Sequence, residues 1–134
     1  MHQRRCLLIL FLVLCTGAVG AAERPNIVLI IADYMGYSDI EPYGATDIRT
    51  PSISRLAAEG VRFTDFYAAA PVCGPARAAL YTGRYPAAIG FEQNIRTEDD
   101  GLDASMPTLS RWLKDAGYRT GLFGKWHLGY GPQH

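Results

Sequence analysis

The chain of 134 residues has little cysteine and no excess of charge of either sign. Thirteen Lys and Arg residues balance thirteen Asp and Glu residues, and without the first 21 residues the balance is 11 against 13, a net charge near −2. That charge leaves no basic surface for nucleic acid, which is therefore excluded as a partner. Only Cys73 lies outside those first 21 residues, so the remainder has no internal disulfide framework.

The first 21 residues have the pattern of a secretory signal peptide. Arg4 and Arg5 precede an apolar run at 6–19, and small residues follow at 20–22. The run is shorter than the roughly 20 residues that cross a bilayer, so no membrane association is expected after cleavage. A buried or membrane-spanning helix and a lipoprotein anchor at Cys15 are weaker alternatives. The prediction is an exported protein that is periplasmic, secreted or lumenal in the secretory pathway.

The remaining residues have the composition of one folded domain. Hydrophobic residues make up 49% and charged residues 19% of the chain, a balance that allows a buried core. Residues 26–32 (NIVLIIA) are a continuous apolar run, typical of a strand covered on both faces in a parallel sheet. Further strand patterns occur at 61–67 and 118–123. Proline and glycine positions predict three intervening helices, from Pro51 to Gly60, Pro75 to Gly83 and Pro107 to Gly117.

Strands that alternate with helices predict an α/β fold with a parallel or mostly parallel sheet. Ligands bind at the carboxyl ends of the strands in such sheets. Asp33 follows the first strand pattern, the loop with Cys73 follows the second, and Lys125 and His127 follow the third. These groups are therefore expected to converge on one site.

Cys73 is the first candidate for chemistry. It is predicted at a helix N-terminus, where free N–H groups and the helix dipole favour a thiolate or a bound anion. Arg77, four residues later, shares its helix face. The plain alternative is a buried, inert cysteine. Residues 92–103 are predicted to be an exposed loop without chemistry.

Three segments resemble the sulfatase family. Residues 71–77 (PVCGPAR), continuing to 80–84 (LYTGR), resemble its first signature, in which the cysteine of a C-x-P-x-R core is oxidised to formylglycine. Residues 117–129 (GYRTGLFGKWHLG) resemble its second signature, and the segment from Arg24 to Tyr37 resembles its opening strand. The resemblance extends from Arg24 to Tyr130 and implies an alkaline-phosphatase-like fold.

The resemblance implies a sulfuric ester hydrolase of arylsulfatase type. Cys73 would become formylglycine, whose hydrate attacks the sulfur and then expels sulfate. Arg77 would hold the formylglycine, Lys125 would neutralise sulfate oxygens, and His127 would hydrogen-bond the hydrate. Asp33 and the group derived from Cys73 would bind one divalent metal ion, usually calcium in this family.

The resemblance also implies partners. These are a sulfated small molecule or sulfated carbohydrate as substrate, and a formylglycine-generating enzyme as a transient partner. Tyr34 departs from the family pattern, because a second metal-binding aspartate is usual there. Family members are also several times longer, so residues 22–134 are predicted to be the N-terminal part of a truncated catalytic domain. A degenerate homologue that binds sulfated ligands, or a phosphonate or phosphodiester hydrolase of the same superfamily, is the alternative.

Overall fold

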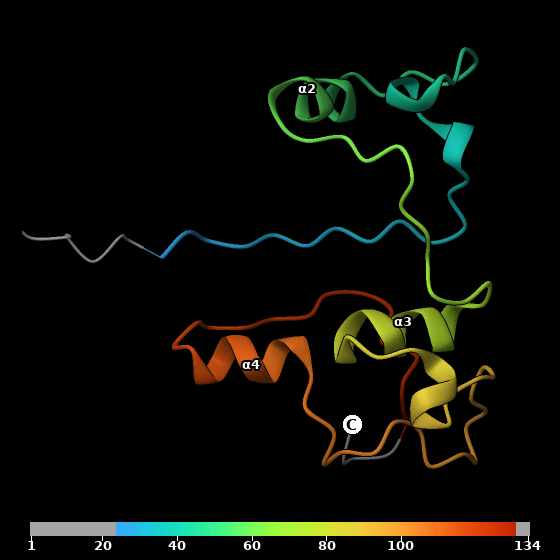
Figure 1. The fold of residues 1–134 in the computed structure, drawn as a ribbon, viewed down its shortest axis with the longest axis vertical. Helices are drawn as coiled ribbons and strands as arrows, with labels where there is room; N and C mark the ends of the chain where they lie inside the picture. Colours follow the sequence, from blue (N-terminus) through green and yellow to red (C-terminus); the bar gives the residue numbers. More distant parts are fainter. Residues whose placement is uncertain (1–23, 131–134) are drawn as a thin grey trace, which may run out of the picture. The chain divides into compact units, whose positions relative to one another are not determined.

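The computed structural model describes residues 24–130, and its regular elements are all helical. The chain divides into two compact units, residues 1–32 and 33–134, and the described part of the first, residues 24–32, has no regular secondary structure. The second unit contains the α-helices α2 (Pro51–Glu59), α3 (Cys73–Thr82) and α4 (Leu109–Asp115), and the 3₁₀-helices η1 (Tyr37–Asp39), η2 (Glu41–Tyr43) and η3 (Pro86–Ile89) (Figure 1). None of the helices formed by residues 24–130 is both long and apolar enough to span a bilayer.

The three predicted helices are confirmed, with shifts at their ends. Helix α2 begins at Pro51, as predicted. Helix α3 begins two residues before Pro75, because a proline within the first turn removes an N–H that has no intrahelical acceptor in any case. Helix α4 begins after Pro107, since the hydroxyl of Thr108 accepts the N–H of Arg111 and caps the helix there.

The parallel sheet is not confirmed, because the part of the chain that the structure describes contains no strand. The predicted strands at 26–32, 61–67 and 118–123 are irregular segments that expose their apolar side chains. Val28 is 83%, Phe66 77% and Phe123 97% exposed. An apolar pattern predicts which side chains are suited to burial, but it does not specify the adjacent strand that would supply backbone hydrogen bonds. Without that adjacent strand, a β-strand does not form.

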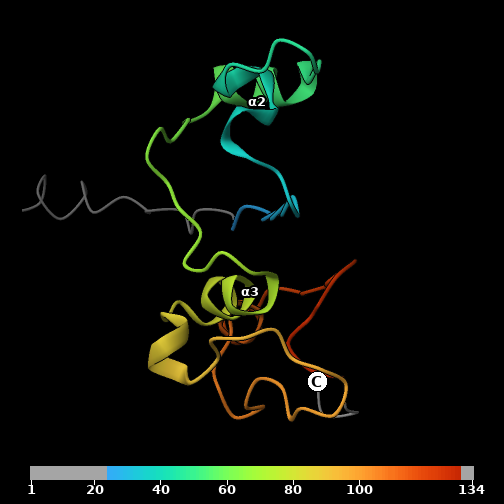
Figure 2. The same ribbon diagram turned by 90° about the vertical axis from the view of Figure 1, so that its right-hand side faces the viewer.

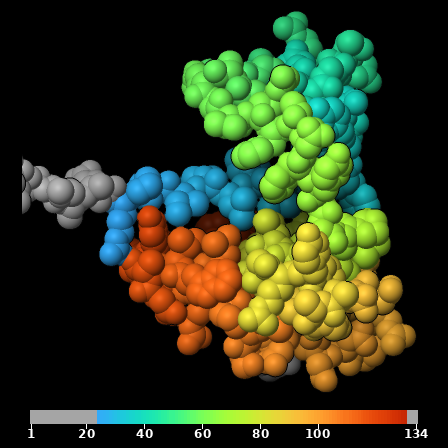
Figure 3. All heavy atoms as spheres, viewed as in Figure 1, coloured from blue at the N-terminus to red at the C-terminus, as the bar shows by residue number. Residues whose placement is uncertain are grey.

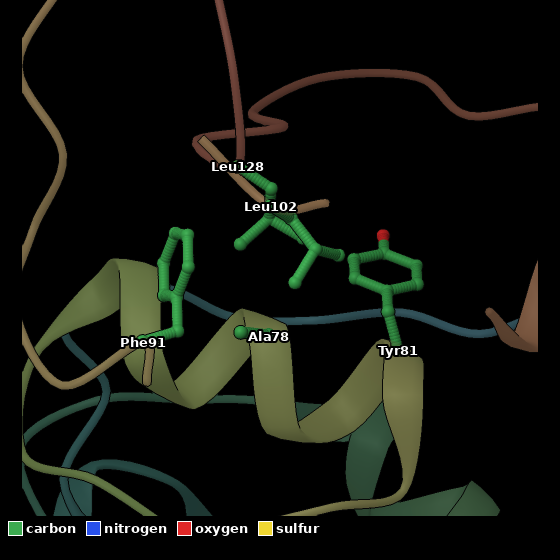
Figure 4. Packing of buried hydrophobic residues seen from close by; sticks show 5 residues of the cluster. All are labelled: Ala78, Tyr81, Phe91, Leu102 and Leu128. Carbon is green, nitrogen blue, oxygen red and sulfur yellow. The ribbon is translucent and has the colours of Figure 1, made fainter. Parts of the chain in front are cut away.

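Helix α3 is the centre of the packing between residues 73 and 130. Helices α4 and η3 both contact it, on different sides (Figures 1 and 2). In the space-filling view the atoms of these segments, yellow to red, form one packed body (Figure 3). The buried core cluster consists of Ala78, Tyr81, Phe91, Leu102 and Leu128 (Figure 4).

The core fixes the segment that follows α4 against α3. Leu128 is fully buried, and its carbonyl accepts the N–H of Leu102 at 2.7 Å. The ring of Trp126 packs on Tyr81 of α3, with 5.2 Å between the ring centroids. Lys125 directly precedes these anchored residues, so its position beside α3 follows from the packing of the core.

A second cluster joins η2 to α2. The Glu41 carboxylate accepts the backbone N–H of Thr50 at 2.7 Å and the hydroxyl of Ser54 at 2.9 Å. The hydrogen bond from Thr50 is the main reason that the pKa of Glu41 is lowered. This carboxylate therefore accepts hydrogen bonds at the N-terminus of α2, whose own N-cap residue makes no capping hydrogen bond with its side chain.

Candidate active site

Cys73 is the first residue of α3, and its thiol is free and half-buried. The preceding Val72 has extended backbone angles and cannot cap the helix with a side-chain oxygen. The sequence places Arg77 one turn further along, and in the structure this arginine is only 7% exposed. A buried guanidinium must find acceptors for its N–H groups, and those acceptors define the site.

Arg77 has one hydrogen-bond acceptor and one ion-pair partner, from distant parts of the chain. Its Nη1 donates to the carbonyl oxygen of Lys125 at 2.7 Å, and its Nη2 lies 3.7 Å from Oδ1 of Asp33. The Lys125 ammonium lies 2.8 Å from the other carboxylate oxygen, Oδ2 of Asp33. Asp33 thus joins the two cations, one at each of its oxygens.

The charges of this group perturb one another. The hydrogen bond from Lys125 is the main cause that lowers the pKa of Asp33, and the charge of Arg77 lowers it further. The pKa of Lys125 is raised, first by its hydrogen bond to Asp33 and then by one to Cys73. Two cations and one carboxylate leave a net positive charge beside Cys73, which favours an anionic ligand.

Replacing Lys125 with methionine is expected to move the pKa of Asp33 upward, toward its ordinary value. The folded-state pKa lies below the unfolded value, so this pair stabilises the fold above the unfolded pKa and loses that effect as the pH falls through the folded pKa. The measurement is the carboxyl carbon shift of Asp33 in an NMR titration between neutral and acid pH. Lys114→Met, on exposed α4 surface, is the matched control and should leave the titration unchanged. An Asp33 titration that is identical in Lys125→Met and the unsubstituted chain would remove this pair from the account.

Tyr34 lies against the same group, and its contact with Cys73 was not predicted from the sequence. The Cys73 thiol donates to the Tyr34 hydroxyl at 3.6 Å, and this contact is the main cause that raises the pKa of Tyr34. Lys125 Nζ lies 5.7 Å from the centroid of the Tyr34 ring. Tyr34 also has a positive φ of 59°, which is uncommon outside glycine and typical of functional sites.

His127 is the predicted site residue whose side chain the contacts above do not reach. Its Nδ1 is buried without a hydrogen-bond partner among the described residues, and its φ is 59°. The structure therefore brings Asp33, Cys73, Arg77 and Lys125 together. His127 is only two residues from Lys125 in the sequence, but its imidazole makes none of the contacts described above. A buried nitrogen without a partner is costly, so this atom remains available for a further hydrogen bond.

The described residues do not make a metal site by themselves. Residues 24–130 contain no cluster of three or more His, Cys, Asp or Glu side chains that could hold an ion. Asp33 is beside Cys73, but its two oxygens face Lys125 and Arg77. Tyr34 offers a neutral phenol where a hard dication requires carboxylate or carbonyl oxygen.

A cavity of about 600 Å³ lies along α4, away from this cluster. Residues 102–108 and Trp126 contribute to its wall, and it contains none of Asp33, Cys73, Arg77 and Lys125. The charged and nucleophilic side chains gather at the start of α3, so we assign the candidate site there rather than to this hollow.

Comparison with known proteins gives one consistent family. A family model described as Sulfatase matches residues 25–134. Arylsulfatase A of Bos taurus is 46% identical over 126 residues, covering 92% of this chain and 25% of that protein. N-acetylgalactosamine-6-sulfatase of Homo sapiens is 44% identical over 126 residues, covering 87% of this chain and 24% of that protein.

Solved structures give the same result. The crystal structure of Ps i-CgsB superposes with a TM-score of 0.80 and 47% identity, over 84% of this chain and 25% of that one. The complex of Ps i-CgsB with k-i-k-neocarrahexaose superposes with a TM-score of 0.79. The chain thus spans about a quarter of the length of the proteins it matches.

Proposed function

The chain belongs to the sulfatase family, and from that membership we propose that the cluster around Cys73 is part of a site that hydrolyses sulfate monoesters. One observation carries the proposal: Asp33, Arg77 and Lys125, far apart in the sequence, meet beside the cysteine of the C-x-P-x-R core. A net positive charge at a helix N-terminus suits a tetrahedral dianion such as sulfate.

We propose that residue 73 acts as formylglycine, produced from Cys73 by a formylglycine-generating enzyme that binds transiently. The hydrated aldehyde supplies the oxygen nucleophile that a thiol does not. The position at the start of α3 directs helix N–H groups and the positive end of the dipole toward charge that develops on the sulfate.

Arg77 and Lys125 would both bind the anion, in different ways. Arg77 is buried and is fixed by the Lys125 carbonyl and by Asp33, so it serves as a rigid positive charge behind residue 73. The Lys125 side chain is 38% exposed, so its ammonium can turn from Asp33 toward a sulfate oxygen. A preorganised charge of this kind stabilises charge that develops in the transition state.

His127 would hydrogen-bond the hydrate or take part in proton transfer. Its Nδ1 is available, since that atom has no partner within the described residues. An imidazole can either accept or donate a proton. This role needs the ring to approach residue 73 more closely than the contacts now indicate.

We propose calcium as the metal, with Asp33 and the group derived from Cys73 among its ligands. The described residues supply too few hard oxygen donors for a complete site, so the proposal requires further ligands and no catalytic step is derived through the ion. When bound, such an ion would polarise the sulfate oxygens.

The remaining expectations are also proposals. Residues 1–21 are proposed as a signal peptide of an exported protein, although they lie outside the described residues, and residues 22–134 as the N-terminal part of the catalytic domain. We further propose that 26–32, 61–67 and 118–123 enter a parallel sheet of an alkaline-phosphatase-like fold. The exposed apolar side chains of these segments support this, because they are suited to a covered face.

The substrate class proposed is a sulfated small molecule or carbohydrate. The oligosaccharide bound to Ps i-CgsB supports the carbohydrate. Tyr34 favours a second candidate function, a catalytically degenerate homologue that binds sulfated ligands, because it removes one acidic metal ligand. A phosphonate or phosphodiester hydrolase is a further alternative that needs the same cluster of cations.

The test is the chemical state of residue 73. When the chain is co-expressed with a formylglycine-generating enzyme, a peptide that spans residue 73 should carry an aldehyde in place of the thiol, as shown by mass spectrometry and by hydrazide labelling. The same chain expressed without that enzyme is the control and should retain the thiol. A thiol that persists in the unsubstituted chain under the same conditions would count against the proposal.

A further inference from the structure

The loop at 92–103 sends one side chain to the start of α3. Asn94 Oδ1 accepts a hydrogen bond from the backbone N–H of Gly74 at 2.8 Å. Gly74 is buried and directly follows Cys73, so the peptide group in this bond is the one between the nucleophile position and the second residue of α3. No local sequence pattern predicts this contact, because the two residues are 20 positions apart.

Helix α3 needs this acceptor because it lacks a cap of its own. The first four N–H groups of a helix have no intrahelical partner, and the N-cap residue usually supplies an oxygen for one of them. In α3 the N-cap residue is Val72, which has no side-chain oxygen. In α4, by contrast, Thr108 caps its own helix. Asn94 therefore provides α3, from a separate loop, with the side-chain oxygen acceptor that Thr108 provides within its own helix.

The amide of Asn94 is held by the residues on either side of it. Phe91 is 7% exposed and belongs to the core cluster, and Ile95 packs against that cluster. The loop also approaches α3 very closely: a Cβ at position 74 would lie 3.1 Å from Asn94 Oδ1 and 3.4 Å from both Asn94 Cα and the Phe91 ring. A side chain at position 74 would therefore require the loop to shift by a few tenths of an ångström.

We propose that Asn94 is a positioning residue for the nucleophile at position 73. Its side-chain oxygen fixes the plane of the peptide between residues 73 and 74, and with it the direction of the Cα–Cβ bond that carries the nucleophile. It also occupies the N–H of Gly74, so a sulfate at the helix start must use other donors. The inference builds on the proposed function, but it concerns a residue that touches only the backbone beside the reacting group.

The first test is amide hydrogen exchange in the chain, followed by NMR. Asn94→Ala should speed exchange at Gly74 by roughly five- to tenfold, the effect of losing one hydrogen bond. Amides in the second half of α3 should keep their protection. Asn94→Asp retains an acceptor oxygen and should restore the protection of Gly74. Gly74 exchange that is the same in Asn94→Ala and the unsubstituted chain, or protection that Asn94→Asp does not restore, would overturn the proposal.

The second test asks whether the side chain of residue 94 lies beside the nucleophile position. The unmodified Cys73 thiol is alkylated with anionic iodoacetate and with neutral iodoacetamide, and the ratio of the two rates is compared between variants. Asn94→Asp adds a negative charge beside residue 73 and should lower the ratio by roughly twofold or more. Gln93→Asp adds the same charge at the exposed neighbouring residue and should have a smaller effect. Equal ratios in these two variants would contradict the proposal.

Neither test requires formylglycine or a sulfate ester. Their failure would therefore remove Asn94 from the site without touching the proposed hydrolase function. Conversely, a chain whose Cys73 is never converted to the aldehyde could still pass both tests, which would leave Asn94 as the residue that orients the start of α3.

Discussion

Replacing Arg77 with alanine is expected to lower aryl-sulfate hydrolysis by a factor on the order of 10² to 10³, the usual effect of removing one preorganised donor. Arg77 is the buried member of the cluster, and its loss leaves the Lys125 carbonyl and one oxygen of Asp33 without their partner. Lys125 would then lose the contact that fixes its backbone against α3. Both cations of the site are thus affected by a single substitution.

The measurement uses a chimera, because the chain spans about a quarter of its relatives. Residues 24–130 replace the matching segment of bovine arylsulfatase A, and the chimera is produced together with a formylglycine-generating enzyme. Arg77→Lys keeps the positive charge, but an ammonium cannot reproduce the two separate guanidinium contacts with Lys125 and Asp33, so this variant should recover little activity. Arg55→Ala, an exposed arginine of α2 outside both signature segments, is the matched control and should retain activity. An Arg77→Ala chimera within about threefold of the parent would contradict this role.

Replacing Tyr34 with aspartate is expected to increase calcium affinity by about tenfold or more, because ligand charge is a main determinant of Ca²⁺ binding. Tyr34 follows Asp33 directly and already lies against Cys73, so a carboxylate there would give the ion a second acidic ligand. Aspartate also tolerates the positive φ of 59° better than tyrosine does. The substitution therefore adds charge without adding backbone strain.

Calorimetric titration of the chain with CaCl₂ measures this effect directly. Tyr34→Phe removes the hydroxyl but adds no charge, so it separates a gain from the carboxylate from a gain caused by losing the contact with Cys73. Tyr34→Phe should bind calcium no better than the unsubstituted chain. If Tyr34→Asp and Tyr34→Phe bind calcium equally, the residue at position 34 is not adjacent to the metal.

The helices could be predicted from the sequence because their signals are local. Pro51 and Gly60 mark the ends of α2, and Gly83 ends α3 with a left-handed φ of 66°. Strands depend on partners that the same few residues cannot specify, and the apolar segments at 26–32 and 118–123 form none among the described residues. The sheet was therefore the part of the fold that the sequence predicted least securely.

In the candidate site, too, relations between residues close in the sequence could be predicted, whereas contacts between distant residues could be predicted only in part. Cys73 and Arg77 are one helical turn apart, so their relation follows from spacing alone. The meeting of Asp33 with Lys125 was predicted from strand ends, yet the structure achieves it without strands, through the carbonyl contact of Arg77. Tyr34 and Asn94 reach the site by contacts that no sequence period encodes.

The most direct test of the proposed hydrolase site is turnover of an aryl sulfate by the unsubstituted chimera, compared with an aryl phosphonate ester and with the Cys73→Ala variant. If the cluster of Asp33, Cys73, Arg77 and Lys125 is a sulfate-ester hydrolase site, the chimera should release sulfate, should prefer the sulfate ester, and should lose turnover in Cys73→Ala. Turnover that survives in Cys73→Ala, or a chimera that contains formylglycine at position 73 and releases no sulfate, would contradict the account.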